Sequence, residues 1–253
     1  MNTSMLMPPS RGSSQPLLSL YTEHYHESLY TQPQPLLFYE FYGTEEPITF
    51  IPTGCVDLLI EEISVTGSLL APDIAYRTIS CIPESRYFGV RFSTGILPSR
   101  HFSTEYFAYG VLRFSSFQDR LSWFLTNYQP EKHVMPLSDP VHYMLEQICL
   151  TNGTISIHKL AKALNYSERH MYRLFLGHMG LNPKHYSRII RFQSTLTQMM
   201  QMPRKNNSEF IRCLGYSDQA HFQREFKEFT GMTPRQFIKL FLASLNDSAE
   251  SSS

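Results

Sequence analysis

Residues 160–167 read LAKALNYS and residues 210–217 read FIRCLGYS, so two segments about 50 residues apart share one pattern of apolar positions. After each copy, five positions recur in the same order: Met171, Arg173, Phe175, Gly180 and Pro183, then Phe222, Arg224, Phe226, Gly231 and Pro234. An internal repeat of this kind indicates one supersecondary unit that is built twice. Its spacing is that of helix, tight turn, second helix and stop, which predicts two helix-turn-helix units.

Residues at the predicted helix boundaries agree with this interpretation. The turns fall on Asn165 and Gly215, and a positive φ there is adopted freely by Gly and tolerated by Asn. We expect the second helix to be capped by Ser167 in the first unit, and by Ser217 or Asp218 in the second. A cap followed by a first-turn proline opens the helix after each unit: Asn182 with Pro183, and Thr233 with Pro234.

Charge is unevenly distributed along the 253 residues, although 22 Lys+Arg balance 22 Asp+Glu. Residues 1–150 carry 8 basic and 15 acidic side chains, whereas residues 151–245 carry 14 basic and 5 acidic ones. A basic excess in the part that holds the repeat is typical of a module that meets a polyanion. No apolar run approaches the roughly 20 residues of a bilayer span, and the polar start does not resemble a signal peptide. We therefore expect a cytoplasmic protein without a membrane partner.

The second helix of a helix-turn-helix enters the major groove of DNA. Candidate base-reading residues lie opposite the predicted core stripe: Arg169, Tyr172 and Arg173 in the first unit, and Gln219, Ala220, Gln223 and Arg224 in the second. Arg suits guanine and Gln suits adenine, because each can form bidentate hydrogen bonds. Candidate phosphate contacts are Ser167, Ser217, His221, Arg204 and Lys205. A linking helix from Pro183 to about Gln201 would span ~28 Å, so one chain could read two adjacent major grooves.

Residues 215–227 (GYSDQAHFQREFK), 231–234 (GMTP) and 180–184 (GLNPK) resemble the signature of the AraC/XylS family of bacterial transcription regulators. The resemblance covers about residues 155–241 and implies an all-helical domain with two helix-turn-helix units. It also implies contact with double-stranded promoter DNA, recruitment of RNA polymerase, as in an activator, and base reading by the positions named above. Ile211 departs from the family pattern, which usually has Ala there, and predicts a splayed or repacked second unit.

The front part of the chain, before the repeat, contains short β-prone runs that alternate with Gly and Pro. This pattern predicts an antiparallel sheet curled into a sandwich or barrel. These runs cover residues 36–42, 48–51, 56–61, 65–70 and 87–92. Residues 114–128 and 140–150 have helical spacing. The fold class is therefore α+β. The expected organisation is a disordered tail at 1–16, a β-rich sensing or self-association domain at 17–113, linking helices at 114–150, a DNA-binding domain at 151–245 and a disordered tail at 246–253.

Other functions of the front part stay open at this point. His24 and His26 share a strand face, as in a metal-dependent cupin-like enzyme, but their spacing fixes no third ligand. Three roles are open for Arg91: contact with an anionic effector, a structural ion pair, or a place on a solvated strand face. The aromatic residues line a pocket for a small apolar effector or simply fill a core: Phe38, Tyr39, Phe41 and Tyr42.

The sequence contains no recognisable set of nucleophile, base and orienting group, so we predict neither an enzyme nor a cofactor. The main alternative is a protein–protein interaction module, in which the repeat binds protein and its basic face does not read bases. Residues 51–58 and 89–92 look similar to an uncharacterised N-terminal domain found on some AraC/XylS-type regulators. That likeness brings no ligand with it, and self-association as a homodimer remains one role for this part.

Overall fold

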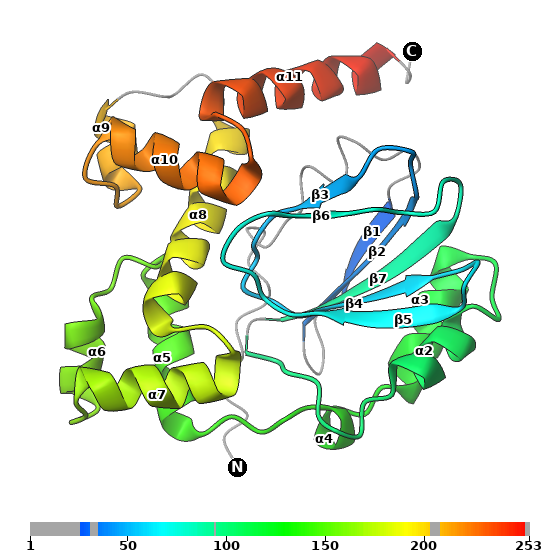
Figure 1. The fold of residues 1–253 in the computed structure, drawn as a ribbon, viewed down its shortest axis with the longest axis horizontal. Coiled ribbons are helices and arrows are strands. Elements are labelled where there is room, and N and C mark those ends of the chain that lie inside the picture. The colour runs from blue at the N-terminus through cyan, green and yellow to red at the C-terminus, as the bar shows by residue number, and fades with distance from the viewer. Residues whose placement is uncertain (1–25, 31–34, 94, 203–207, 251–253) are drawn as a thin grey trace.

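The computed structural model describes residues 26–30, 35–93, 95–202 and 208–250. A part built on antiparallel strands comes first, a helical part follows, and the two lie side by side (Figure 1). The fold class is α+β, as the sequence predicted. Among the predicted features, the tail at 1–16, His24, Arg204 and Lys205 lie outside the described residues.

Five antiparallel strands form the main sheet in the order β1-β2-β7-β4-β5, and two short strands, β3 and β6, pair with each other. The strands are β1 His26–Tyr30, β2 Leu36–Tyr42, β3 Ile48–Phe50, β4 Asp57–Glu61, β5 Thr66–Leu70, β6 Arg77–Ile79 and β7 Arg86–Phe92. The five predicted strands are present with ends within one residue of the expected ones. Strands β1 and β6 were not predicted, since one is a mostly exposed edge and the other has three residues.

Helices make up most of the chain beyond Thr104. They are α2 Thr104–Val111, α3 Phe117–Asn127, α4 Pro130–His133, α5 Asp139–Leu150, α6 Ile157–Ala163, α7 Glu168–Met179, α8 Pro183–Gln201, α9 Ser208–Cys213, α10 Gln219–Thr230 and α11 Pro234–Glu250. Helix α11 therefore enters the segment expected to be a C-terminal tail. No helix in the described part of the chain is long and apolar enough to cross a membrane.

Alternate residues of the central strands face two different apolar clusters. Phe38 and Val90 lie with α2 and α3 on one face, whereas Tyr39 and Phe41 lie with β3 on the other. Helices thus cover one face of the five-stranded sheet and the small β3–β6 sheet covers the other. The aromatic residues expected either to line a pocket or to fill a core do the latter, apart from the half-buried Tyr42.

The two helices expected to link the parts belong to different cores. Leu121 and Phe124 of α3 pack with the sheet. Val141, Met144 and Ile148 of α5 pack instead with the helices that follow. The main division between the two cores therefore falls between α3 and α5.

Arg91 forms a buried ion pair, one of the roles left open by the sequence. Its side chain is 1% exposed, and its Nε and Nη2 donate to the two carboxylate oxygens of Asp57 at 2.8 and 3.1 Å. The guanidinium also lies over the Tyr39 ring, 5.6 Å from the centroid. The suggestion of a solvated strand face was wrong, because the β3–β6 sheet covers that face of β7.

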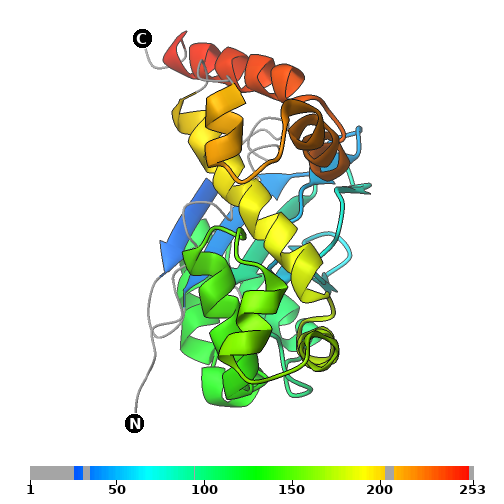
Figure 2. The same ribbon diagram turned by 90° about the vertical axis from the view of Figure 1, so that its left-hand side faces the viewer.

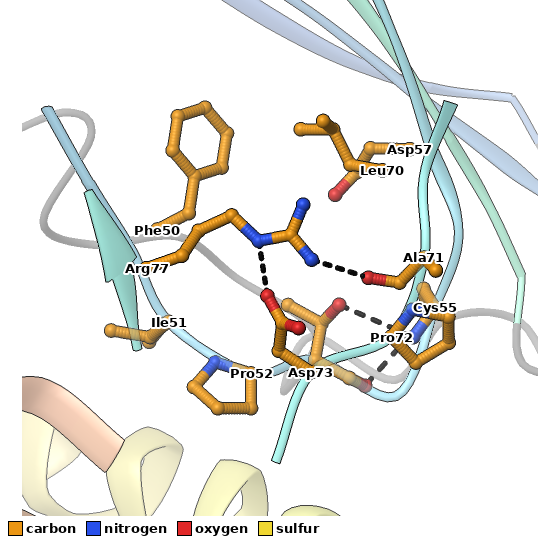
Figure 3. A pocket seen from close by; sticks show the side chains of 11 residues that line it. Phe50, Ile51, Pro52, Cys55, Asp57, Leu70, Ala71, Pro72, Asp73 and Arg77 are labelled. Atoms are coloured by element: carbon orange, nitrogen blue, oxygen red, sulfur yellow. Dashed lines mark hydrogen bonds and ion pairs between the residues drawn. The ribbon is translucent and has the colours of Figure 1, made fainter. Parts of the chain in front are cut away.

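A small cavity lies beside Asp57, between the β3–β6 sheet and the loop after β5 (Figure 3). Arg77 pairs there with Asp73 and donates to the Ala71 carbonyl at 3.0 Å. The cavity has a volume of about 20 Å³, which is enough for one water molecule. The front part, as it stands in this structure, offers no room here for an effector of drug size.

The front part contacts α8 through the loop between β3 and β4. Gln193 of α8 donates from Nε2 to the Pro52 carbonyl at 2.6 Å. Ile51 is buried in the helical core. Gly54 has a φ of 73°, and a Cβ there would lie 3.0 Å from the Tyr186 ring. The loop therefore packs directly against α8.

Candidate nucleic-acid interface

The first helix-turn-helix unit consists of α6 and α7, and its turn is built as the sequence predicted. Asn165 has a φ of 54°. Ser167 caps α7, and its hydroxyl accepts from the His170 amide at 3.2 Å. Met171 and Phe175 of α7 are both fully buried. The tight turn, the capping hydrogen bond at the start of α7 and the buried apolar face of α7 together define how the two helices meet.

The second unit consists of α9 and α10 and has the same construction. Gly215 in its turn has a φ of 86°. Of the two residues expected as caps, Asp218 takes the role, and its Oδ1 accepts from the His221 amide at 2.7 Å. That backbone hydrogen bond, followed by one from Ser217, lowers the pKa of Asp218 below its ordinary value. The cap of α10 is therefore a charged carboxylate, which suits the positive end of a helix dipole.

Each unit ends alike and leads into a new helix. Gly180 and Gly231 are left-handed, with φ of 69° and 76°. Asn182 caps α8, with Pro183 as its first residue. Thr233 and Gln236 form the capping box at the start of α11: the Thr233 amide donates to Gln236 Oε1 at 2.8 Å and the Gln236 amide to Thr233 Oγ1 at 3.3 Å.

Ile211, the departure from the family pattern, is accommodated in the core. It is 1% exposed and belongs to the same apolar cluster as Phe222 and Phe226. The second unit keeps its tight turn and its capped second helix around the larger side chain. The structure thus buries Ile211 in the core, and the prediction of a splayed or repacked unit stays a prediction.

The candidate base-reading residues lie on the outward faces of α7 and α10. Tyr172 is half-buried. The other six are exposed: Arg169, Arg173, Gln219, Ala220, Gln223 and Arg224. Arg173 Nη2 lies 3.0 Å from His170 Nδ1. The equivalent arginines of the repeat, Arg173 and Arg224, are thus both available to a partner in solution.

Among the candidate phosphate contacts, Ser167 and Ser217 are exposed and His221 is half-buried. All three lie at the beginning of a second helix. Ser217 Oγ lies 3.2 Å from His221 Nδ1 and donates to Asp218 Oδ2 at 3.1 Å. These side chains are placed where helix N-termini hold phosphates.

Helices α7 and α10, the second helices of the two units, begin on the same side of the helical part. In Figure 1, α7 and α10 both begin on the left, on the side of the helical part that points away from the sheet. Helix α8 runs between them, and Figure 2 looks onto the side where both begin. The front part lies at the opposite side, so it does not cover the beginning of either helix.

A groove of about 780 Å³ separates the two units. Its walls come from the segment before α6, from α8 and from α10, and they include Arg224. Lys184, Arg188 and Arg191 contribute positive charge from α8, whereas Glu225 and Glu228 contribute negative charge from α10. The groove is therefore basic along α8 and mixed along α10.

Glu225 is a residue of this region for which the sequence analysis predicted no role. It is 2% exposed, although it follows the exposed Arg224 directly in α10. Its carboxylate accepts from Arg188 Nε at 2.8 Å and from Arg191 Nη2 at 2.9 Å. The signal in the sequence was an acidic residue on the stripe of Phe222 and Phe226, where only apolar residues were expected.

The described residues offer no metal site of the kind considered from the sequence. There, no group of three or more His, Cys, Asp or Glu side chains could hold a metal ion. His26, one half of the metal pair considered above, lies in the edge strand β1, with its ring centroid 6.3 Å from that of Phe117. The four cysteines are free thiols.

Comparison with known proteins agrees with this geometry. Residues 160–239 match the family described as a helix-turn-helix domain. The Msm operon regulatory protein of Streptococcus mutans is 27% identical over 87 residues, which are 34% of this chain and 31% of that protein. The C-terminal region of this chain is a helix-turn-helix domain of the AraC/XylS type, a DNA-binding class. The chain spans less than a third of that relative's length.

Solved structures that match this chain have low sequence identity. The C-terminal domain of AraT, a response regulator from Geobacillus stearothermophilus, is 21% identical with a TM-score of 0.37, covering 42% of this chain and 88% of that one. ToxT from Vibrio cholerae is 12% identical with a TM-score of 0.43, covering 86% of this chain and 99% of that one.

Proposed function

We propose that this chain is a sequence-specific regulator of transcription that reads two adjacent major grooves of promoter DNA with α7 and α10. One observation carries the proposal: two capped helices of a duplicated unit begin on the same side of α8 and expose equivalent arginines, Arg173 and Arg224. Bidentate Arg–guanine and Gln–adenine contacts would provide base discrimination. Phosphate contacts from Ser167, Ser217 and His221 would set the register.

The front part acts in this proposal as a sensing or self-association domain. Its support is the contact between the β3–β4 loop and the middle of α8. Because α8 lies between the two units, a change in this loop would reach both of them. Recruitment of RNA polymerase, a small-molecule effector and a homodimer belong to the same proposal, as does a cytoplasmic location.

The proposal is tested by titrating the full chain with a promoter sequence selected from random duplexes and with unselected DNA. We expect tighter binding to the selected sequence, and an affinity that falls linearly on a log–log plot against salt, because phosphate contacts release counterions. A protein–protein interaction module with a non-reading basic face would show no base preference. Equal binding to both DNAs at moderate salt would refute the regulator.

A further inference from the structure

Three side chains connect the second reading helix to α8 at a buried point. Glu225 of α10 is 2% exposed, and its carboxylate faces Arg188 and Arg191, which are three residues apart on one face of α8. Arg188 uses Nε at 2.8 Å, and Arg191 places Nη2 2.9 Å from each carboxylate oxygen. A buried carboxylate is costly unless it is paired and hydrogen-bonded, so this geometry fixes which faces of α8 and α10 meet.

The two arginines extend this connection along the second unit. Arg191 lies over the Tyr216 ring, 4.7 Å from its centroid, just before α10 begins. Arg188 lies 5.1 Å from the Phe229 ring centroid and donates from Nη2 to Glu228 at 2.6 Å. Burial lowers the pKa of Arg188, but hydrogen bonds to Glu228 and Glu225 outweigh it and leave the pKa above its ordinary value. The cluster thus holds α10 near its beginning, middle and end.

The first unit has no such ion pair at the corresponding place. The repeat puts Leu174 where the second unit has Glu225, and Leu174 packs against the apolar core. Helix α7 is also followed almost directly by α8, with Gly180 at its end and Pro183 at the start of the next helix. Helix α10, by contrast, comes after α9 and is separated from the end of α8 by 17 residues, so side-chain contacts must orient it.

We propose that Glu225 is a positioning residue for DNA recognition: through Arg188 and Arg191 it sets the orientation of α10 relative to α7. The inference rests on the proposed function. Gln223 and Arg224 immediately precede Glu225, so any rotation or tilt of α10 about this point moves them relative to Arg173. Both reading helices would then no longer match one duplex at once, even though each unit stays folded.

The test compares Glu225→Gln with the wild-type full chain on two duplexes. One is the sequence selected by the wild type, and the other carries one extra base pair between the halves read by the two units. Gln keeps the shape of the side chain and removes its charge. We expect the preference for the selected spacing to fall about tenfold, within the range of one bidentate base contact, and hydroxyl-radical protection to weaken over one half-site only.

Lys227→Gln is the matched control, because Lys227 lies on the same helix two residues after Glu225, its side chain is exposed, and the change also replaces a charged group by a neutral amide. It should keep the spacing preference of the wild type. If Glu225→Gln weakens binding to both duplexes by the same factor and only lowers the melting temperature, Glu225 is a structural residue and the proposal fails. A wild-type chain that prefers no sequence would instead refute the proposed function.

Arg191→Lys decides the question if Glu225→Gln does not fold. It keeps a positive charge opposite Glu225 and removes the planar group that lies over Tyr216. A smaller fall in spacing preference in a chain with the wild-type circular dichroism spectrum supports the proposal. An unchanged spacing preference in this folded variant overturns it.

Discussion

The two helix-turn-helix units share one sequence pattern and one local geometry, yet they are attached to the rest of the domain in different ways. Asn165 and Gly215 take the same left-handed turn, and each second helix begins with a side-chain cap. The first unit is then fixed by its short connection to α8 and by apolar packing. The second also packs on α8 through the rings of Phe226 and Phe229, which lie 5.5 and 4.9 Å from that of Phe192, but it adds the ion pairs of Glu225.

This difference shows which properties of a duplicated unit follow from the duplication. Turns, caps and buried stripes depend on residues a few positions apart, so both copies reproduce them. The attachment depends on residues that were not duplicated, such as Arg188 and Arg191 of α8. Under the proposed role of Glu225, the orientation of α10 relative to α7 therefore depends on residues of the single linking helix α8.

Replacing the reading arginines should have the largest effect on the comparison. Arg173→Ala and Arg224→Ala should each weaken binding to the selected promoter by about 5- to 150-fold, corresponding to about 1–3 kcal/mol for a bidentate base contact. Binding to random DNA should fall much less in both variants. The measurement is a titration of both DNAs at one salt concentration.

Lys205→Ala provides the contrast for these arginine variants, because a phosphate contact is expected to weaken all DNA alike. Lys227→Ala, in the last turn of α10, controls for the loss of one exposed charge. If Arg173→Ala affects both DNAs equally while Arg224→Ala does not, the two units are not equivalent readers, and the comparison holds for their fold alone.

Exchanging the turn residues should change the stability of the two units by different amounts. Gly215→Asn should destabilise the second unit by about 1 kcal/mol, because a Cβ there would lie 2.7 Å from Thr154 Cγ2. Asn165→Gly should change the stability by less than about 0.5 kcal/mol, because relief of the left-handed turn is offset by a more flexible unfolded chain. Urea denaturation of both variants measures this. Equal and opposite effects would show that φ alone matters in the two turns.

Much of the fold was predictable because its determinants are local. Short β-prone runs between Gly and Pro predicted β2 and β4, and the repeat predicted the positive φ of Asn165 and the cap at Ser167. The pairing of Arg91 with Asp57 was not specified, since its partner lies on another strand, 34 residues away. Glu225 was missed for a similar reason: its partners are on another helix, and periodicity ranks positions as apolar or polar without showing which buried charge meets which.

The smallest expected difference between the units is the pH dependence of their caps. The pKa of Asp218 is lowered in the folded state, first by the hydrogen bond from the His221 amide. Its charge therefore stabilises the fold above the ordinary value of 3.8, and this contribution is lost as the pH falls through the lower folded-state pKa. Ser167 is neutral, so its cap has no such dependence.

Asp218→Asn tests this difference, because Asn also caps helices but carries no charge. Its melting temperature should be slightly below that of the wild type at pH 7, and the gap should narrow once the pH falls below the ordinary pKa of 3.8, as the wild-type carboxylate takes up its proton. Ser167→Ala should lower the free energy of unfolding by about 1 kcal/mol. This loss should be similar at neutral and at acidic pH, because the Ser167 hydroxyl carries no charge. A gap for Asp218→Asn that stays constant over this range would mean that the charge of Asp218 adds nothing to the second unit, and that the two caps are equivalent.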